Sequence, residues 1–459
     1  MRALPALLAA ALALPAGAAP LTLDEALAVA ARNNGDLGVA RAVRDAAGVD
    51  LYQSYAGVLP RLDLAGGSGR RFIAGQSSVQ VVPSLVRDSS GAIVDVTFAS
   101  QVVPIPAIDF ADHQLGLTLR WTLFDGLSSW RGIGAARERS RAADRQYDES
   151  VLQISFEVSR RFYDVVKQER ILEVRRETAA RSEDLVGRAD ALFTAGRGSR
   201  ADTFAARVNL GNDRIAVETQ RAEVERARAD LALALGLDPD AATGVVPPAP
   251  VSGPGIGDAA DPPPLEALVA RAGAGRPLLA ARRGAVAAAD LDAGRARGGY
   301  WPVLGLEGIY QRQSTDLTGR GGVLGDLSRQ YTALARVTFT WNLFQGRETL
   351  SAEQRAAVQA RRARVESEQA GHQVAAEIAR ARAAAVALSR AAALAQDNQV
   401  AAEQGLALAR ERLEAGAATQ LEVRDATVKL AEAKLALVAA LVDHAVARAD
   451  LNRAVGGTL

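Results

Sequence analysis

Apolar residues alternate with polar residues in two short segments of the chain. In the segment 115–123 every second residue is apolar: Leu115, Leu117, Leu119, Trp121 and Leu123. The segment 337–343 shows the same alternation at Val337, Phe339, Trp341 and Leu343. A period of two is typical of a β-strand that has one apolar face. A weaker alternation precedes each segment, so we expect one strand hairpin over about 58–125 and another over about 302–345.

Two much longer stretches follow a period of seven. In the first, apolar residues recur at Val158, Val165, Leu172, Ala179, Val186 and Phe193. In the second, they step by four and three residues at Val374, Ile378, Ala381, Ala385, Leu388, Ala392 and Ala395. Sustained heptads indicate coiled-coil packing of α-helices. We therefore expect long helices over about 126–195 and 346–415, followed by return helices over about 199–236 and 418–455.

The distribution of proline supports these long helices. The chain has 17 Pro, but none lies between Pro106 and Pro239 and none follows Pro302. A proline inside a helix costs about 3 kcal/mol, so the proline-free stretches are those in which uninterrupted helices can form. A helix of about 70 residues would span ~105 Å. No single globular core requires an element of that length.

The chain repeats one plan twice. The sequence LFDG at 123–126 corresponds to LFQG at 343–346, and Ala-Gly at 195–196 corresponds to Ala-Gly at 415–416. In both copies 70 residues separate the two glycines, which indicates a rigid element of fixed length. Pro60 corresponds to Pro302, at an offset of 242 rather than 220, so the first copy carries about 22 extra residues between its strands.

The first residues have the pattern of a secretory signal. Arg2 precedes the apolar run Leu4–Leu14, and Ala16-Gly17-Ala18 fits a cleavage site. We therefore divide the chain into a signal peptide (1–18), a first repeat (19–237), a Pro/Gly-rich linker (238–264) and a second repeat (265–459). No later run of 18 or more residues is apolar, so we expect no membrane-spanning helix. An exported chain of this kind is either soluble or inserted as a β-barrel.

Composition excludes several classes of function. The formal net charge is +1, which gives no basic surface for nucleic acid. The chain has no Cys, so it has no disulfide, no thiolate metal site and no lipid-modified cysteine. Its three His are widely spaced, which gives no histidine cluster for a zinc site. The sequence also shows no pattern of a nucleophile, a base and an orienting group. We expect no enzyme activity, no cofactor and no metal.

Four strands in one chain cannot close a barrel, and an open sheet edge is not tolerated in lipid. If the alternating strands face a membrane, several copies of the chain must therefore close the barrel together. Trp at the end of both strongly alternating strands suits a membrane interface. Two simpler interpretations stay open for the separate parts: the edge of a soluble β-sandwich for the strands, and an ordinary coiled coil for the helices.

Taken together, these features resemble the TolC-type outer-membrane factor family. The resemblance covers nearly all of the mature chain, and it is carried by the order, duplication and spacing of short motifs. These are LTLDEAL at 21–27, the break at 33–35, Leu59-Pro60, the LFDG and LFQG junctions, LFTAGRGSRAD at 192–202 and LEAGAATQLEV at 413–423.

The resemblance implies an α+β membrane protein with an internal two-fold repeat. Four strands per protomer would form a 12-stranded outer-membrane barrel in a homotrimer, continued by an antiparallel coiled-coil tunnel in the periplasm. The lipid-facing residues would include Leu117, Leu119, Trp121, Phe339 and Trp341. The implied partners are a periplasmic adaptor (membrane fusion) protein, an inner-membrane pump driven by protons or ATP, and outer-membrane lipid. No nucleic acid is expected.

The resemblance also places two functional regions. The helix-hairpin turns would form the periplasmic tip that meets the adaptor, at Leu192, Ala195, Gly196, Leu413, Ala415 and Gly416. The tip glycines are expected in turn conformations that are costly for other residues. Acidic residues just beyond the tips would line the closed end of the tunnel as rings that bind cations: Asp202, Glu422 and Asp425. A solvated helix face explains the same acids equally well.

The expected function is passive conduction of solutes across the outer membrane, energised by the partner proteins. Efflux of small toxic molecules and type I protein secretion share this architecture, and the sequence does not separate them. A non-conducting envelope coiled coil or adhesion protein is a further alternative. We expect the segment 70–114 to form an external loop, or to fold partly into the barrel mouth, with its Val- and Ile-rich stretches adding short strands.

Overall fold

The computed structural model describes residues 21–238 and 262–457. The predicted signal peptide and nearly all of the predicted linker lie outside the described residues. The chain forms two compact units. A helical unit comprises the described parts of Met1–Asp50, Arg137–Ala289 and Gln359–Leu459, and a strand unit comprises Leu51–Ala136 and Asp290–Val358. Each unit takes segments from both sequence repeats, so the compact units do not coincide with the repeats.

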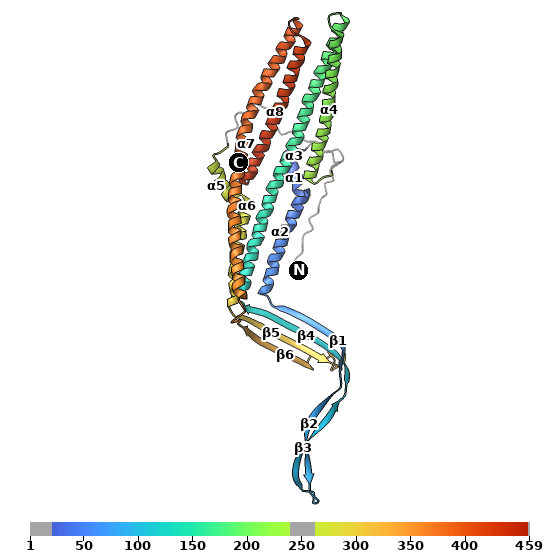
Figure 1. Ribbon diagram of the computed structural model, residues 1–459, viewed down its shortest axis with the longest axis vertical. Helices are drawn as coiled ribbons and strands as arrows, with labels where there is room; N and C mark the ends of the chain where they lie inside the picture. The colour runs from blue at the N-terminus through green and yellow to red at the C-terminus, as the bar shows by residue number, and fades with distance from the viewer. Residues whose placement is uncertain (1–20, 239–261, 458–459) are drawn as a thin grey trace. The chain divides into compact units, whose positions relative to one another are not determined.

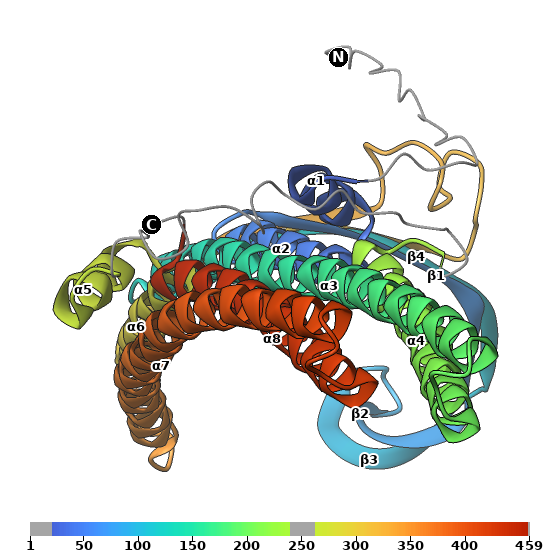
Figure 2. The same ribbon diagram turned by 90° about the horizontal axis from the view of Figure 1, so that it is seen from above.

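Four long helices form two antiparallel hairpins (Figure 1). The first hairpin consists of α3 (Ser128–Thr194) and α4 (Arg200–Leu235), and the second of α7 (Glu348–Glu414) and α8 (Gln420–Val455). Both α3 and α7 contain 67 residues, and both α4 and α8 contain 36. The equal lengths agree with the equal spacing of the glycines, and 67 residues correspond to ~100 Å of helix. Seen from above, α3, α4, α7 and α8 lie side by side in a curved layer (Figure 2).

Shorter helices precede the strands of each half. They are α1 (Leu23–Asn33), α2 (Gly35–Ser54), α5 (Leu265–Gly275) and α6 (Pro277–Ala296), with 3-10 turns at Tyr55–Gly57 and Arg297–Tyr300. The break between α1 and α2 confirms the predicted break at 33–35, and a corresponding break separates α5 from α6 before Pro277. Helix α1 begins with a capping box, in which Thr22 accepts from the Glu25 amide and the Glu25 carboxylate accepts from the Thr22 amide.

The heptad positions form the core of the helical unit. Val158 and Val165 of α3 are buried against α1 and the end of α4. Val374, Ile378, Ala381 and Ala385 of α7 are buried against α5 and α8. Both stretches therefore pack as predicted along most of their length. Phe193 is exposed, because it lies in the last turn of α3, where the helical layer ends.

The strand unit contains a four-stranded antiparallel sheet in the order β1-β4-β5-β6 (Figure 1). The strands are β1 (Arg61–Ile73), β4 (Ile108–Phe124), β5 (Val303–Ser314) and β6 (Tyr331–Thr340). The four strands of this sheet agree with the two predicted hairpins. The end of the second hairpin was predicted wrongly, because β6 stops at Thr340. Trp341 and Leu343 therefore lie beyond the strand, where the chain turns through positive φ at Gly346 and Arg347.

The expectation that Val- and Ile-rich stretches of 70–114 add strands is confirmed, but these strands are long and leave only short turns between them. Strand β1 continues to Ile73, and β2 (Gln76–Arg87) pairs with β3 (Ile93–Ile105) as a separate two-stranded sheet. The strands are 12 and 13 residues long, because valines at alternate positions favour extended pairing. Asp88 closes the turn between them by accepting from the amides of Ser90 and Ala92.

No helix within the described ranges is both long and apolar enough to cross a membrane.

Candidate functional site at the hairpin tips

The two hairpin tips have the same backbone geometry. Gly196 and Gly416 adopt φ values of 67° and 70°, which confirms the expected left-handed turn conformation. At the first tip, the amide of Arg197 donates to the carbonyl of Leu192, and at the second the amide of Ala417 donates to Arg412. These bonds satisfy carbonyl groups at the helix ends. A side chain at either glycine would force a strained backbone, so each turn depends on glycine.

The predicted adaptor-contact residues lie on the surfaces of these tips. Ala195, Gly196, Ala415 and Gly416 are exposed, whereas Leu192 and Leu413 are half-buried. Leu413 packs against a cluster of buried residues that joins α7 and α8. The tips therefore combine exposed small residues with a leucine that supports the turn from beneath. Contact with an adaptor stays a prediction.

The three predicted gate acids each have a local partner. Asp202 and Glu422 occupy equivalent positions in capping boxes, where their carboxylates accept from the amides of Ser199 and Thr419. Glu422 also lies 3.7 Å from Arg412, and Asp425 lies 2.6 Å from Lys429. The hydrogen bond from Lys429 to Asp425 raises the pKa of that lysine. A helix-capping role is therefore established for two of the acids, and their role in a gate stays a prediction.

An ion pair near the tips joins the two hairpins. Arg424 of α8 donates to both carboxylate oxygens of Asp213 of α4, at 2.7 and 3.2 Å, and to the hydroxyl of Ser182 of α3, at 2.7 Å. The side chains of Arg424 and Asp213 are only 19% and 16% exposed. We call these three residues the clasp. Charge-assisted bidentate contacts of this kind are among the strongest hydrogen bonds in proteins.

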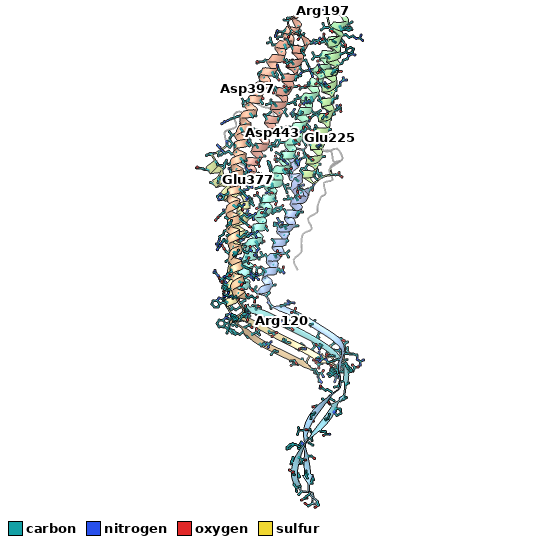
Figure 3. All side chains as sticks on the ribbon, in the orientation of Figure 1. Arg120, Arg197, Glu225, Glu377, Asp397 and Asp443 are labelled. Carbon is teal, nitrogen blue, oxygen red and sulfur yellow. The ribbon has the colours of Figure 1, made fainter. Side chains whose placement is uncertain are left out.

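Two further ion pairs connect α3 to α8. Lys434 lies 2.7 Å from Glu177, and Lys167 lies 3.1 Å from Asp443. Asp443 is labelled in Figure 3. Leu185 of α3 also packs against the buried residues of α7 and α8 near the tip. The hairpins are thus held together by polar contacts along their length, of which the clasp is the nearest to the tips.

A cavity of about 220 Å³ lies beside the clasp. It is lined by residues of both hairpins: Ser182, Leu185, Asp202, Ala205, Ala206, Asn209, Gln420, Leu421 and Arg424. The structure therefore brings Asp202 together with Arg424, which the sequence did not single out. Glu422 and Asp425 are not among the lining residues.

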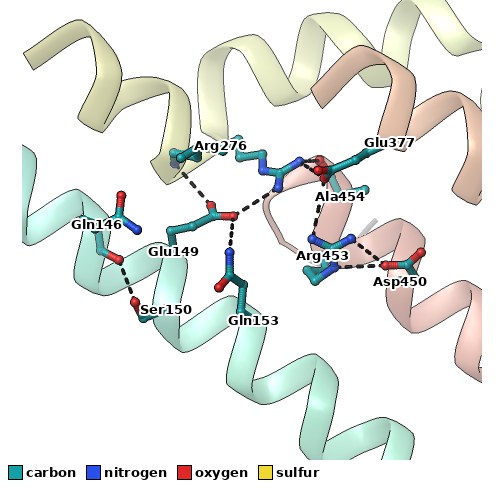
Figure 4. Close-up of polar contacts among 10 residues, drawn as sticks. Gln146, Glu149, Ser150, Gln153, Arg276, Glu377, Asp450, Arg453 and Ala454 are labelled. Atoms are coloured by element: carbon teal, nitrogen blue, oxygen red, sulfur yellow. Dashed lines mark hydrogen bonds and ion pairs between the residues drawn. The ribbon is translucent and has the colours of Figure 1, made fainter. Parts of the chain in front are cut away.

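A second polar cluster, centred on the buried side chains of Arg276 and Glu149, lies at the other end of α8 (Figure 4). Arg276, between α5 and α6, donates to Glu149 at 3.1 Å, to Glu377 at 2.8 Å and to the carbonyl of Ala454 at 3.2 Å. The second oxygen of Glu149 accepts from the amide of Leu278. The side chains of Arg276 and Glu149 are each 1% exposed. Through Arg276 and Glu149, this buried cluster links α3, α6, α7 and α8.

Neither cluster was predicted from the sequence. Ser182, Asp213 and Arg424 are separated by 31 and 211 positions, and no motif connects them. Arg276 had one usable signal, because it is a charged residue at a helix break directly before Pro277. Its partners Glu149 and Glu377 lie 127 and 101 positions away, within long helices that contain many other acids.

The four-stranded sheet has a mainly apolar side, on which the Arg70–Asp109 ion pair and Arg312 also lie, and a side rich in charged residues. The predicted lipid-facing residues Leu117, Leu119 and Phe339 share the apolar side with Leu62, Leu64 and Leu306. Trp121 shares this side, and Trp341 lies just past the strand; their ring N–H groups donate to the carbonyls of Val58 and Tyr300. The opposite side carries charged residues in ion pairs: Arg61, Asp63, Arg71, Asp112, Arg120, Glu307 and Arg336.

Comparison with solved structures shows the same fold in outer-membrane proteins. A membrane protein from Pseudomonas aeruginosa matches with a TM-score of 0.75 and 21% identity, covering 95% of this chain and 90% of that chain. The CmeC outer membrane channel of Campylobacter jejuni matches with a TM-score of 0.74 and 18% identity, over 95% and 85%. The MtrE outer membrane channel of Neisseria gonorrhoeae, in its open state, gives 0.72 and 18%, over 95% and 89%.

The family comparison covers both halves of the chain. None of the curated proteins matches the sequence. The sequence profile of the outer membrane efflux proteins matches residues 26–237 and 268–457, which are nearly all of the two predicted repeats. The fold, the duplicated helical hairpins and this match lead to one conclusion: the chain belongs to the outer membrane efflux protein family.

Proposed function

We propose that three copies of this chain form an outer-membrane duct that conducts solutes out of the cell. The observation that carries this proposal is the four-stranded sheet, which has a mainly apolar side, a side rich in charged residues and two unpaired edges at β1 and β6. Unpaired edges are not tolerated in lipid, so neighbouring copies must pair them. Family membership supports the outer-membrane location and a channel rather than an enzyme.

The remaining parts of the proposal concern partners and cargo. The exposed hairpin tips would dock to a periplasmic adaptor, and through it to an inner-membrane pump. The cargo would be small toxic molecules, with secreted polypeptides as the alternative. Because the chain contains no cysteine, we propose that the barrel holds it in the membrane without a lipid anchor.

The number of copies can be measured directly. We expect native mass spectrometry of the detergent-purified protein to give a complex of three chains, because the family implies a trimer. Three four-stranded sheets would make a barrel wide enough to leave a lumen. A stable monomer with soluble behaviour would instead favour a non-conducting envelope coiled coil and would contradict the duct.

The acidic gate gives a second prediction. Current through reconstituted wild-type protein should fall when Mg²⁺ is added, and the double variant Glu422→Gln/Asp425→Asn should lose most of this response. Glutamine can replace glutamate in a capping box, and the exposed Asp425–Lys429 pair is worth at most about 1 kcal/mol, so the variant should fold. The matched control is Asp397→Asn/Glu403→Gln on α7, which removes the same charge further from the tip. Equal Mg²⁺ sensitivity in the two double variants would contradict an acidic gate.

A further inference from the structure

The two-stranded sheet of β2 and β3, which we call the ribbon, continues the β1–β4 hairpin without a change of register. The last pair of the larger sheet is Ile73 with Ile108, and the first pair of the ribbon is Gln76 with Ile105. From the first of these pairs to the second, the chain advances by three residues on one strand and goes back by three residues on the other. The pairing is interrupted only at the bend, where Gly75 lies close to the backbone of Ala107. The side of the ladder on which each ribbon residue lies can therefore be followed from the sheet into the ribbon.

The two faces of the ribbon differ in polarity. One face carries apolar residues in directly opposed pairs: Val79 with Val102, Pro83 with Phe98, and Leu85 with Val96. Val81, opposite Ser100, and Pro104, opposite Ser77, complete this apolar face. The other face is mixed, and it carries the ribbon's Gln76, Ser78, Gln80, Ser84, Asp95, Thr97 and Gln101. Between Ser77 and Leu85 the apolar face has no charged residue.

The apolar face is exposed in the single chain. Phe98 is 72% exposed and Val79 is 65% exposed. An isolated two-stranded sheet is marginally stable in water, and a contiguous apolar patch of this kind marks an interaction surface. The face therefore needs a cover that the single chain does not supply within its described residues.

The polarity of the hairpin reverses at the bend. By register, the apolar face of the ribbon lies on the same side of the ladder as Arg71 and Asp112, the charged side of the larger sheet. Leu64 and Leu117 lie on the opposite side, which also carries the Arg70–Asp109 ion pair nearer the bend. If the leucines face lipid and the charges face the lumen, the apolar face of the ribbon turns toward the lumen axis. Lipid would then meet the mixed face instead.

We propose that the apolar faces of three ribbons pack against one another around the axis and narrow the outer mouth of the duct. The occupant of each apolar face is thus the same face on the two other copies of this chain. A three-fold axis brings identical faces together, and their lack of charge allows them to exclude water. In the sequence, the ribbon connects the ends of β1 and β4 that are far from the helices. Under the proposed function, these ends are extracellular. This inference rests on the proposed trimeric duct.

Single cysteines test the packing, because the wild-type chain has none. Ser100 lies on the apolar face opposite Val81, and its neighbour Gln101 lies on the mixed face opposite Gln80. We expect Ser100→Cys to form covalent dimers and trimers with a short bismaleimide in membranes, at a yield at least tenfold above that of Gln101→Cys. Serine to cysteine changes one atom, so the ribbon should fold as in the wild type.

The outcomes separate this inference from the proposed function. A three-chain complex in which Ser100→Cys crosslinks no better than Gln101→Cys would overturn the ribbon packing and leave the duct intact. Quenching of a bimane label at Ser100→Cys by brominated lipid would also overturn the ribbon packing, because the apolar face would then lie in the bilayer. A monomer by native mass spectrometry would overturn both. As a second variant, Phe98→Asp should raise single-channel conductance at least twofold while the complex stays trimeric, and an unchanged conductance would contradict a narrowed mouth.

Discussion

Replacement of Glu149 by alanine is expected to destabilise the helical unit by about 3–5 kcal/mol, because it removes the principal partner of a buried charge. Arg276 is 1% exposed, and the remaining carboxylate near it, Glu377, is itself 31% exposed. The substitution also leaves the amide of Leu278 without its acceptor. Breaking a buried pair by removing one partner costs much more than deleting a surface pair, since the remaining charge is left uncompensated.

Thermal unfolding followed by circular dichroism, at one protein concentration in one detergent, measures this effect. The matched control is Glu173→Ala on the same helix, which removes an exposed pair with Arg170 and should cost less than about 1 kcal/mol. The double variant Glu149→Met/Arg276→Met should recover part of the loss, because it removes the uncompensated charge as well. Similar unfolding midpoints for Glu149→Ala and Glu173→Ala would show that the buried cluster does not hold the helices together.

Loss of the clasp is expected to have the largest effect on conduction. Arg424→Leu removes all three hydrogen bonds that join α8 to α3 and α4 near the tip and leaves Asp213 largely buried without its cation. If the hairpins separate when the duct opens, the clasp stabilises only the closed state. A loss of about 2 kcal/mol from that state would raise the ratio of open to closed duct about thirty-fold. We therefore expect a higher open probability in single-channel records.

Two variants show whether the ion pair itself is responsible. Arg207→Leu removes an exposed pair with Asp190 that joins α3 to α4 within one hairpin, so it should leave conduction unchanged. The exchange Arg424→Asp/Asp213→Arg restores opposite charges across the same gap and should bring the open probability back toward the wild type. An Arg424→Leu channel that opens no more often than Arg207→Leu would remove the clasp from the mechanism.

Sequence periodicity predicted the elements whose pattern repeats locally. The heptads and the paired glycines identified α3 and α7 to within two residues at each end, because helical periodicity extends over many turns. Alternation identified the four strands of the larger sheet. It did not locate the end of β6, since Trp341 and Leu343 keep the alternating pattern where the backbone has already left the strand. The segment 70–114 was expected to be a loop with short strands, and the length of β2 and β3 was not predicted.

The two polar clusters could not be predicted from local sequence patterns. Arg424 stands between Glu422 and Asp425, so in sequence it is one charge among several on a polar helix face. Only the packing of α8 against α3 and α4 brings it to Asp213 and Ser182. The acids at the tips were found because of a family resemblance, and the structure assigned a capping role to two of them. The charges that the fold buries were found only when the distant helices were placed together.

The central claim is that this chain forms a conducting duct, and single-channel recording in planar bilayers tests it most directly. We predict discrete current steps from purified wild-type protein, and longer openings from Arg424→Leu under the same conditions. The Arg424→Leu variant guards against a duct that is simply closed in the wild type. Absence of current above the bilayer background from both proteins, with the protein demonstrably inserted, would contradict the claim.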